Sequence, residues 1–271
     1  MTEFSRTLIE RSGYDDEAFA ELYDRHRPSP PAALLDILAL VAQTEQPRLV
    51  VDLGAGTGLS TLAWAERADE VVGVEPNPSM IRRARLVTRA PNVRYVEAFA
   101  GDTGLRESSA DLVTCAQSFH WMEPAPVLAE AARVLRPGGV FAAYDYDVRP
   151  IVQPEVDEAF AAHLAARRRA RARLGLAAGV ETWPKEEHLD RIRESGRFRF
   201  AREIVCHGME TVDADRVVGL AQTLGGPHAL FHEDAGEVME TFERVRAVAR
   251  RVLGDGTRTM VVCYWIRLGI K

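Results

Sequence analysis

The chain of 271 residues is long enough to bury a full hydrophobic core, and its composition is that of an ordinary globular protein. Its formal net charge of -6 argues against a general affinity for nucleic acids or anionic membranes, and no segment has enough uninterrupted apolar residues to span a bilayer. The first residues lack the apolar stretch of a signal peptide. The three cysteines lie in apolar runs without metal-ligand spacing, which indicates free thiols in a reducing cytoplasm and no metal site.

The first segment, residues 1–46, is predicted to be helical beyond residue 13. One helix is expected from Tyr14 to Arg27 and another from about Ala32 to Gln43, because prolines between them stop the first. Tyr14, Tyr23 and Arg27 are candidates for a lid over a ligand site. The alternative is a surface helix whose tyrosines pack inward.

An apolar run that ends in an aspartate leads into a glycine-rich turn: Val50-Val51-Asp52-Leu53-Gly54-Ala55-Gly56-Thr57-Gly58-Leu59-Ser60. The run predicts a buried strand, and the glycines allow a tight turn whose backbone can approach a ligand closely. Leu59 stands where the dinucleotide fingerprint G-x-G-x-x-G has its third glycine, so that fingerprint fails. An acid before the glycines would repel a pyrophosphate and suits an ammonium group. A tight turn without a ligand is the alternative.

The stretch resembles the first motif of the class I S-adenosylmethionine-dependent methyltransferases. Their cofactor carries an ammonium, a carboxylate and a sulfonium but no phosphate. The resemblance implies that S-adenosylmethionine is bound here, and it implies cofactor contacts for the following residues: Asp52, Gly54, Ala55 and Gly56.

A predicted strand from Glu70 to Glu75 ends in an acid about twenty residues beyond the glycines, where a doubly wound fold brings a carboxylate to a ribose. A carboxylate can accept hydrogen bonds from both ribose hydroxyls. The resemblance gives this role to Glu75, and places Pro76 and Met80 against the adenosyl group. A solvated acid in a loop is the alternative.

The next strand, Val93 to Val96, is followed by the position at which the family usually has an acid for the adenine amino group and then a small residue. This chain has Phe99 and Ala100 there. Phe99 could stack on the adenine ring, without the hydrogen bond. In a shifted register, Asp102 would serve instead.

The fourth predicted strand, Ala110 to Ala116, runs into Gln117-Ser118-Phe119-His120-Trp121-Met122. In open α/β sheets, ligands bind beyond the carboxyl ends of strands, so we expect this loop to face the glycine turn, with Gln117 near the cofactor. The loop lacks the Asn/Asp-Pro-Pro-Tyr/Phe tetrad of nucleic-acid amino-methylating enzymes. It resembles the Phe-His-Trp signature of small-molecule enzymes related to trans-aconitate methyltransferase. His120 is the catalytic candidate, as a base or as a scaffold, and Trp121 a candidate pocket wall.

A helix from about Pro126 to Leu135 is expected to stop at a turn, Arg136-Pro137-Gly138-Gly139, before a strand from Val140 to Tyr146. Tyr146 is a candidate at the substrate mouth. The helix expected from Pro154 to Leu174 carries five arginines, Arg167, Arg168, Arg169, Arg171 and Arg173. They indicate a solvated face, or a surface that attracts an anionic substrate.

The rest of the chain is predicted to alternate again. Helices are expected at about 185–194, 212–224 and 233–252, and strands at 198–206 and 260–268. His228, in a glycine-rich loop, is a second candidate for the acceptor pocket.

Alternating strands and helices predict an α/β fold with a mainly parallel sheet. The resemblance implies a doubly wound, Rossmann-like sheet of seven strands, with the last antiparallel, and a helical substrate cap. We expect a lid (1–46), a cofactor-binding core (47–150), an inserted cap helix (151–183) and a C-terminal part with acceptor-pocket helices (184–271).

The predicted function is methyl transfer from S-adenosylmethionine to a small organic acceptor, on oxygen, nitrogen or carbon. Two alternatives remain open. One is a protein that binds the cofactor without transferring the methyl group, for which Phe99 in place of an acid is the main argument. The other is methylation of protein or RNA, which the missing tetrad and the negative charge disfavour. The sequence does not predict the oligomeric state.

Overall fold

The computed structural model describes residues 17–147, 149, 151–175, 182–224 and 236–271. Two compact units each combine several segments of the chain. Unit 1 comprises Met1–Pro28, Asp147–Val180 and Met209–Val262, and unit 2 comprises Ser29–Tyr146, Glu181–Gly208 and Cys263–Lys271. The expected division into lid, core, cap and C-terminal part remains a prediction.

The predicted seven-stranded α/β sheet is confirmed, with the order β3-β2-β1-β4-β5-β7-β6. Neighbours from β3 to β5 pair in parallel, and β7 runs antiparallel to β5. The strands are β1 (Leu49–Leu53), β2 (Glu70–Val74), β3 (Val93–Val96), β4 (Ala110–Ala116), β5 (Leu135–Tyr146), β6 (Phe200–Val212) and β7 (Arg258–Ile270). The strand order reverses at β1 and β4, which is where open α/β sheets bind ligands.

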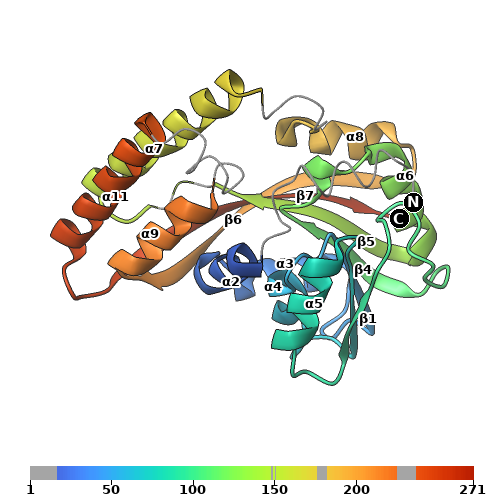
Figure 1. Cartoon of the computed structure of the whole chain (residues 1–271). Coiled ribbons are helices and arrows are strands. Elements are labelled where there is room, and N and C mark those ends of the chain that lie inside the picture. Colours follow the sequence, from blue (N-terminus) through green and yellow to red (C-terminus); the bar gives the residue numbers. More distant parts are fainter. Residues whose placement is uncertain (1–16, 148, 150, 176–181, 225–235) are drawn as a thin grey trace. The chain divides into compact units, whose positions relative to one another are not determined.

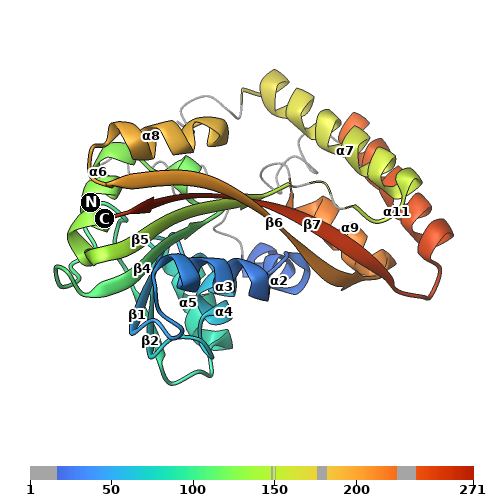
Figure 2. The same ribbon diagram turned by 180° about the vertical axis from the view of Figure 1, so that it is seen from behind.

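Helices flank the sheet within unit 2, because its central strands are apolar on both faces. The helices α3 (Ala32–Val41), α4 (Leu59–Ala63) and α5 (Pro78–Val87) lie along one side, and α6 (Pro124–Val134) and α8 (His188–Glu194) along the other (Figures 1 and 2). Two single turns, η1 (Phe119–Trp121) and η2 (Lys185–Glu187), complete this unit. The helix after the glycine turn, α4, is short and ends at Ala63.

The start of α5 is fixed by a local cap. The side chain of Asn77 accepts hydrogen bonds from the backbone N–H groups of Ser79 (2.9 Å) and Met80 (3.4 Å), and Pro78 occupies the first turn. Both features are typical helix starts. They fix the backbone immediately after Glu75.

The turn expected at residues 136–139 is not the boundary that the sequence indicated. β5 already begins at Leu135, which pairs with Ala110, and the register with β4 shifts before Val140 pairs with Leu112. This irregularity accommodates the proline and the glycines inside a strand. Arg136 holds the distortion in place by an ion pair with Asp111 at 2.5 Å.

Unit 1 contains four described helices: α2 (Glu17–His26), α7 (Pro154–Arg173), α9 (Ala214–Thr223) and α11 (Glu237–Leu253). α11 packs against α7 and α9, and α2 packs against α9. Of the arginines predicted to form a solvated or anion-attracting face, Arg167 is fully buried and Arg169 is paired with Glu237. Arg167 donates from Nη1 to the backbone oxygens of Ala221 (3.1 Å) and Gln222 (3.2 Å), so it caps the end of α9.

Among the described residues, no helix is long and apolar enough to cross a membrane, and no group of metal-ligating side chains occurs. None of the three cysteines forms a disulfide; Cys115 and Cys206 are buried, whereas Cys263 is partly exposed.

Gly73 in β2 packs closely against Tyr95 and Ala55, below the glycine turn. A Cβ added to Gly73 in β2 would lie 2.6 Å from Cδ1 of Tyr95 and 2.9 Å from Cβ of Ala55. We expect Gly73→Ala to lower the free energy of unfolding by about 1–3 kcal/mol through overpacking, measured by urea denaturation. Gly256→Ala is the matched control, because its nearest contact would be an ordinary 3.5 Å. Equal stabilities of the two variants would contradict this assignment.

Candidate functional site

The glycine turn follows β1 and needs its glycines for two different reasons. Gly54, Gly56 and Gly58 all have positive φ, at 71°, 56° and 93°. A Cβ on Gly54 would lie 2.6 Å from Cβ of Ser118, so only glycine permits this close approach to the loop after β4. Gly56 is different, because a Cβ there would meet nothing within 4 Å. Its backbone therefore borders open space in which a ligand could lie.

Glu75, directly after β2, joins the two loops at this end of the sheet. Its Oε2 accepts a hydrogen bond from the backbone N–H of Gly56 (3.0 Å), and its Oε1 accepts one from that of Asn77 (2.9 Å). Burial raises the pKa of the carboxyl group, although both of these hydrogen bonds oppose the shift. The acid predicted for the ribose thus lies against the glycine turn.

Asp52 lies below the turn and is fully buried. Its carboxylate accepts hydrogen bonds from the hydroxyls of Thr61 (2.8 Å) and Thr114 (2.9 Å), so it ties α4 and β4 to β1. Burial raises its pKa to about 6, against the effect of these hydroxyls. These contacts brace the turn; a contact with the cofactor remains a prediction.

The loop after β3 forms a tight turn, in which the N–H of Asp102 donates to the backbone oxygen of Phe99 at 3.0 Å. Phe99 is partly exposed, and the side chain of Asp102 is exposed. Three other predicted cofactor residues are placed as follows: Met80 and Ala100 are buried, and Pro76 is partly exposed. Glu130 on α6, which sequence analysis did not identify, anchors this loop by accepting from the N–H (2.9 Å) and hydroxyl (2.5 Å) of Thr103.

Gln117 begins the second functional loop in an unusual conformation. Its φ of 53° is a left-handed value that non-glycine residues seldom adopt, and such residues cluster at functional sites. Its N–H donates to the backbone oxygen of Tyr144 (2.9 Å), and its side-chain Nε2 donates to that of Tyr146 (3.1 Å). The ammonium of Lys185 donates to its Oε1. The strained backbone is therefore held on three sides.

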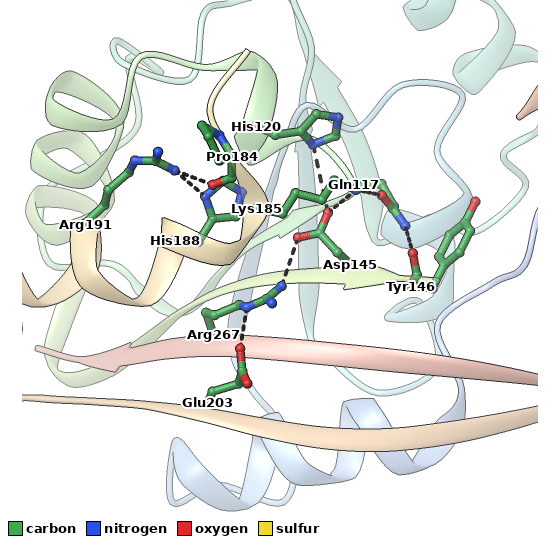
Figure 3. Close-up of polar contacts among 10 residues, drawn as sticks. All are labelled: Gln117, His120, Asp145, Tyr146, Pro184, Lys185, His188, Arg191, Glu203 and Arg267. Carbon is green, nitrogen blue, oxygen red and sulfur yellow. Dashed lines mark hydrogen bonds and ion pairs between the residues drawn. The ribbon is translucent and has the colours of Figure 1, made fainter. Parts of the chain in front are cut away.

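His120 lies on η1 beside this loop (Figure 3). Its Nδ1 is buried, has no hydrogen-bond partner in the described part of the chain, and lies 3.9 Å from Oδ1 of Asp145. Burial, together with the charge of Lys185 and the proximity of His188, lowers the pKa of the imidazole to about 2. The side chain is therefore neutral at physiological pH.

Asp145, at the end of β5, belongs to a network of four charged residues with Lys185, Arg267 and Glu203 (Figure 3). Lys185 lies 2.7 Å from Oδ1 and Arg267 lies 3.5 Å from Oδ2. Arg267 also pairs with Glu203 on β6 at 2.7 Å. Sequence analysis did not identify Lys185, Arg267 or Glu203, since none belongs to a recognisable motif.

The predicted acceptor-pocket residues are divided between the units. In unit 2, Trp121 lies beside His120 with ring centroids 5.0 Å apart, and Tyr146 packs edge-on against Tyr264. In unit 1, the guanidinium of Arg27 lies 4.5 Å from the ring centre of Tyr23 and donates to the backbone oxygen of Thr223 at 2.5 Å. Tyr14 and His228 lie outside the described residues.

Comparisons with known proteins agree with this geometry. Residues 51–143 match a family model described as a methyltransferase domain. The uncharacterized methyltransferase Rv3342 of Mycobacterium tuberculosis is 42% identical over 117 residues, which are 43% of this chain and 46% of that protein. An uncharacterized methyltransferase-like protein of Schizosaccharomyces pombe, C25B8.10, is 33% identical over 118 residues, 43% of this chain and 45% of the relative. The chain thus spans less than half the length of these curated relatives.

One solved structure extends the similarity to nearly the whole chain. A protein of Anaeromyxobacter dehalogenans, assigned to the type II methyltransferases, is 30% identical with a TM-score of 0.64, covering 90% of this chain and 97% of that one. Phosphoethanolamine N-methyltransferase 2 of Haemonchus contortus, 15% identical, shares the fold with a TM-score of 0.57 in a complex with S-adenosyl-L-methionine, and it covers 100% of this chain and 60% of its own. The chain belongs to the class I S-adenosylmethionine-dependent methyltransferases, the family that the motifs predicted, and S-adenosylmethionine is the cofactor of that family.

Three largely buried histidines have lowered pKa values, and we therefore expect the free energy of unfolding to fall in mild acid. Burial is the main cause that holds the pKa of His120 at about 2, that of His188 at about 3 and that of His163 at about 4, against 6.5 for a free imidazole. Below about pH 6.5, only the unfolded chain takes up these protons, so the free energy of unfolding should fall by about 2 kcal/mol per histidine between about pH 7 and pH 5. Asp52, with its raised pKa, offsets about 1 kcal/mol of this loss.

Urea denaturation followed by tryptophan fluorescence at several pH values measures this effect. His188→Gln is the informative variant, because glutamine cannot take up the proton and should remove about one histidine's share of the pH dependence. A free energy of unfolding that stays constant or rises toward pH 5 would show that these side chains are not held neutral.

Proposed function

We propose that this protein transfers the methyl group of S-adenosylmethionine to a small organic acceptor, on an oxygen, nitrogen or carbon atom. The observation that supports this best is the pairing of an open glycine backbone at Gly56 with the buried carboxylate of Glu75, 3.0 Å away. It provides a close backbone approach and a hydrogen-bond acceptor for a sugar at the point where the strand order reverses. A tight turn without a ligand would need neither the open space at Gly56 nor a buried carboxylate beside it.

The surrounding residues fit the chemistry of this cofactor. In the proposed site, Glu75 accepts from the ribose hydroxyls, and the turn of Gly54, Ala55 and Gly56 lies against the methionine part. The adenosyl group is bordered by Pro76, Met80, Phe99 and Ala100. Asp52 contributes negative charge that suits an ammonium group, and Gln117 lies at the carboxyl end of β4. When bound, the cofactor supplies a methyl group already activated by its sulfonium.

Most of the catalysis is then positional. The protein's part is to hold the acceptor in line with the reactive carbon and to exclude water. We assign Trp121 and Tyr146 to the walls of the acceptor pocket, whereas the roles of Tyr23, Arg27 and His228 stay predictions from the sequence. His120, as a neutral imidazole, is the group that takes a proton from the acceptor where the acceptor must lose one. The acidic net charge of -6 and the absence of the amino-methylation tetrad support a small molecule rather than a nucleic acid.

The role of Glu75 can be tested against an acid on the same strand. We expect Glu75→Ala to weaken binding of S-adenosylmethionine about 10- to 100-fold, because a charged hydrogen-bond acceptor is lost. Glu70→Ala is the matched control, since Glu70 is exposed and pairs with the exposed Arg94. Equilibrium dialysis with labelled cofactor measures both. Equal losses, or no loss in Glu75→Ala, would remove Glu75 from the site.

Methyl transfer itself is tested by release of S-adenosylhomocysteine with a panel of small acids, phenols and amines. On an acceptor that turns over, His120→Ala should lower kcat about 100-fold or more if His120 takes the proton, and a loss below about tenfold would leave it a scaffold. Cofactor binding without turnover across the panel would favour the alternative, a binding protein without transferase activity.

A further inference from the structure

Two donors face the same oxygen of Asp145. The Nζ of Lys185 lies 2.7 Å from Oδ1, which is a hydrogen-bonded ion pair, whereas Nδ1 of His120 lies 3.9 Å from that atom, too far for a hydrogen bond. The other oxygen, Oδ2, faces Arg267 at 3.5 Å. Asp145 is buried, so water does not readily replace a missing partner. Of these two donors, only the ammonium of Lys185 is within hydrogen-bonding distance of Oδ1.

Among the residues with described positions, the Nδ1 atom of His120 lacks the hydrogen bond that a nearby carboxylate would be expected to accept. Its Nδ1 is buried and has no hydrogen-bond partner within the described ranges, although a carboxylate lies nearby. Buried polar atoms are nearly always paired, so an unpaired one needs an explanation. The second ring nitrogen points away from Asp145 (Figure 3). An imidazole that donates Nδ1–H to a carboxylate is oriented and becomes a stronger base at its other nitrogen.

Lys185 is held in this position by the segment that carries it. The N–H of Trp183 donates to the backbone oxygen of His120 at 2.8 Å, and the ring of His188 packs edge-on against Phe119. Lys185 also donates to Oε1 of Gln117. Residues 183–188 thus contact the loop after β4 at three points: the backbone of His120, the ring of Phe119 and the side chain of Gln117. The ion pair between Lys185 and Asp145 is thus one of several contacts that join residues 183–188 to the end of the sheet near His120.

We propose that Lys185 is a positioning residue that keeps His120 apart from its carboxylate partner by occupying Oδ1 of Asp145. Its consequence for catalysis rests on the proposed function, in which His120 takes the acceptor's proton: movement of Lys185 away from Oδ1 allows Nδ1–H to bond to Asp145. Among the residues that the structure describes, the charged and titratable groups around His120 are Asp145 on β5, Lys185 on η2 and His188 on α8, with Arg267 on β7 behind Asp145.

The test is the titration of His120 in the free protein, followed by NMR of protein labelled at histidine Cε1. The His120→Gln spectrum identifies its signal among the seven histidines. In the wild type we expect no titration of His120 above about pH 4, in line with its lowered pKa. In Lys185→Met, the pKa should rise by about one unit or more, a tenfold gain in proton affinity, because Oδ1 becomes available.

Three controls separate the contact from simple loss of charge. Lys185→Arg keeps a donor for Asp145 and should leave His120 untitrated, and Arg193→Gln, which removes a charge from α8 without a contact to Asp145, should do the same. In the double variant Lys185→Met with Asp145→Asn, most of the rise should disappear. Lys185→Gln replaces Lys185→Met if the latter does not fold.

An unchanged pKa in a folded Lys185 variant, or an equal rise in the double variant, would overturn the proposal. These titrations contain neither cofactor nor acceptor. Failure of the proposed function would instead appear as absence of S-adenosylmethionine binding in the same wild-type sample, independently of the measured pKa of His120.

Discussion

The carboxylate of Glu75 is the contact on which the arrangement of the site depends. It accepts from Gly56 in the turn after β1 and from Asn77 at the cap of α5, so one buried group fixes the ends of two parallel strands. Asp52, which is buried below the glycine turn, connects β1 to β4 and α4 by accepting hydrogen bonds from two threonine hydroxyls. Both carboxylates carry a pKa raised by burial. A site that holds two carboxylates at such cost is expected to bind a group that compensates for their charge.

The loop after β4 follows a different principle. Its conformation is imposed by contacts from later segments: Gln117 adopts a left-handed backbone that is held by Tyr144, Tyr146 and Lys185. The neutral state of His120 is likewise imposed by burial, by a lysine and by a second histidine. The turn of glycines is therefore a locally encoded element, whereas the chemistry at His120 depends on residues more than sixty positions away in the sequence.

This difference explains what could be predicted from the sequence. The strand, glycine turn and following acid are contiguous motifs whose physical requirements act locally, and they indicated the α/β class and the family resemblance. The seven strands and the antiparallel last strand were implied by that resemblance. The bulge at residues 136–139 was missed because proline and glycine signal a turn equally well. Burial of Arg167 was missed because only packing against α9 distinguishes it from its exposed neighbours. Arg267 on β7 reaches Asp145, and Glu203 on β6 reaches Arg267, through the strand order β5-β7-β6, which no local pattern contains. Lys185 reaches Asp145 from η2, which no local pattern predicts either.

The central claim is that the end of β1 and β2 is a site for a nucleoside without a pyrophosphate. Isothermal titration of the purified protein with S-adenosylmethionine, with NADH as the control ligand, tests it most directly. The account predicts a dissociation constant of about micromolar order for S-adenosylmethionine, and no heat of binding for NADH. Binding of NADH, or of neither ligand by a protein whose circular dichroism shows it to be folded, would contradict the account.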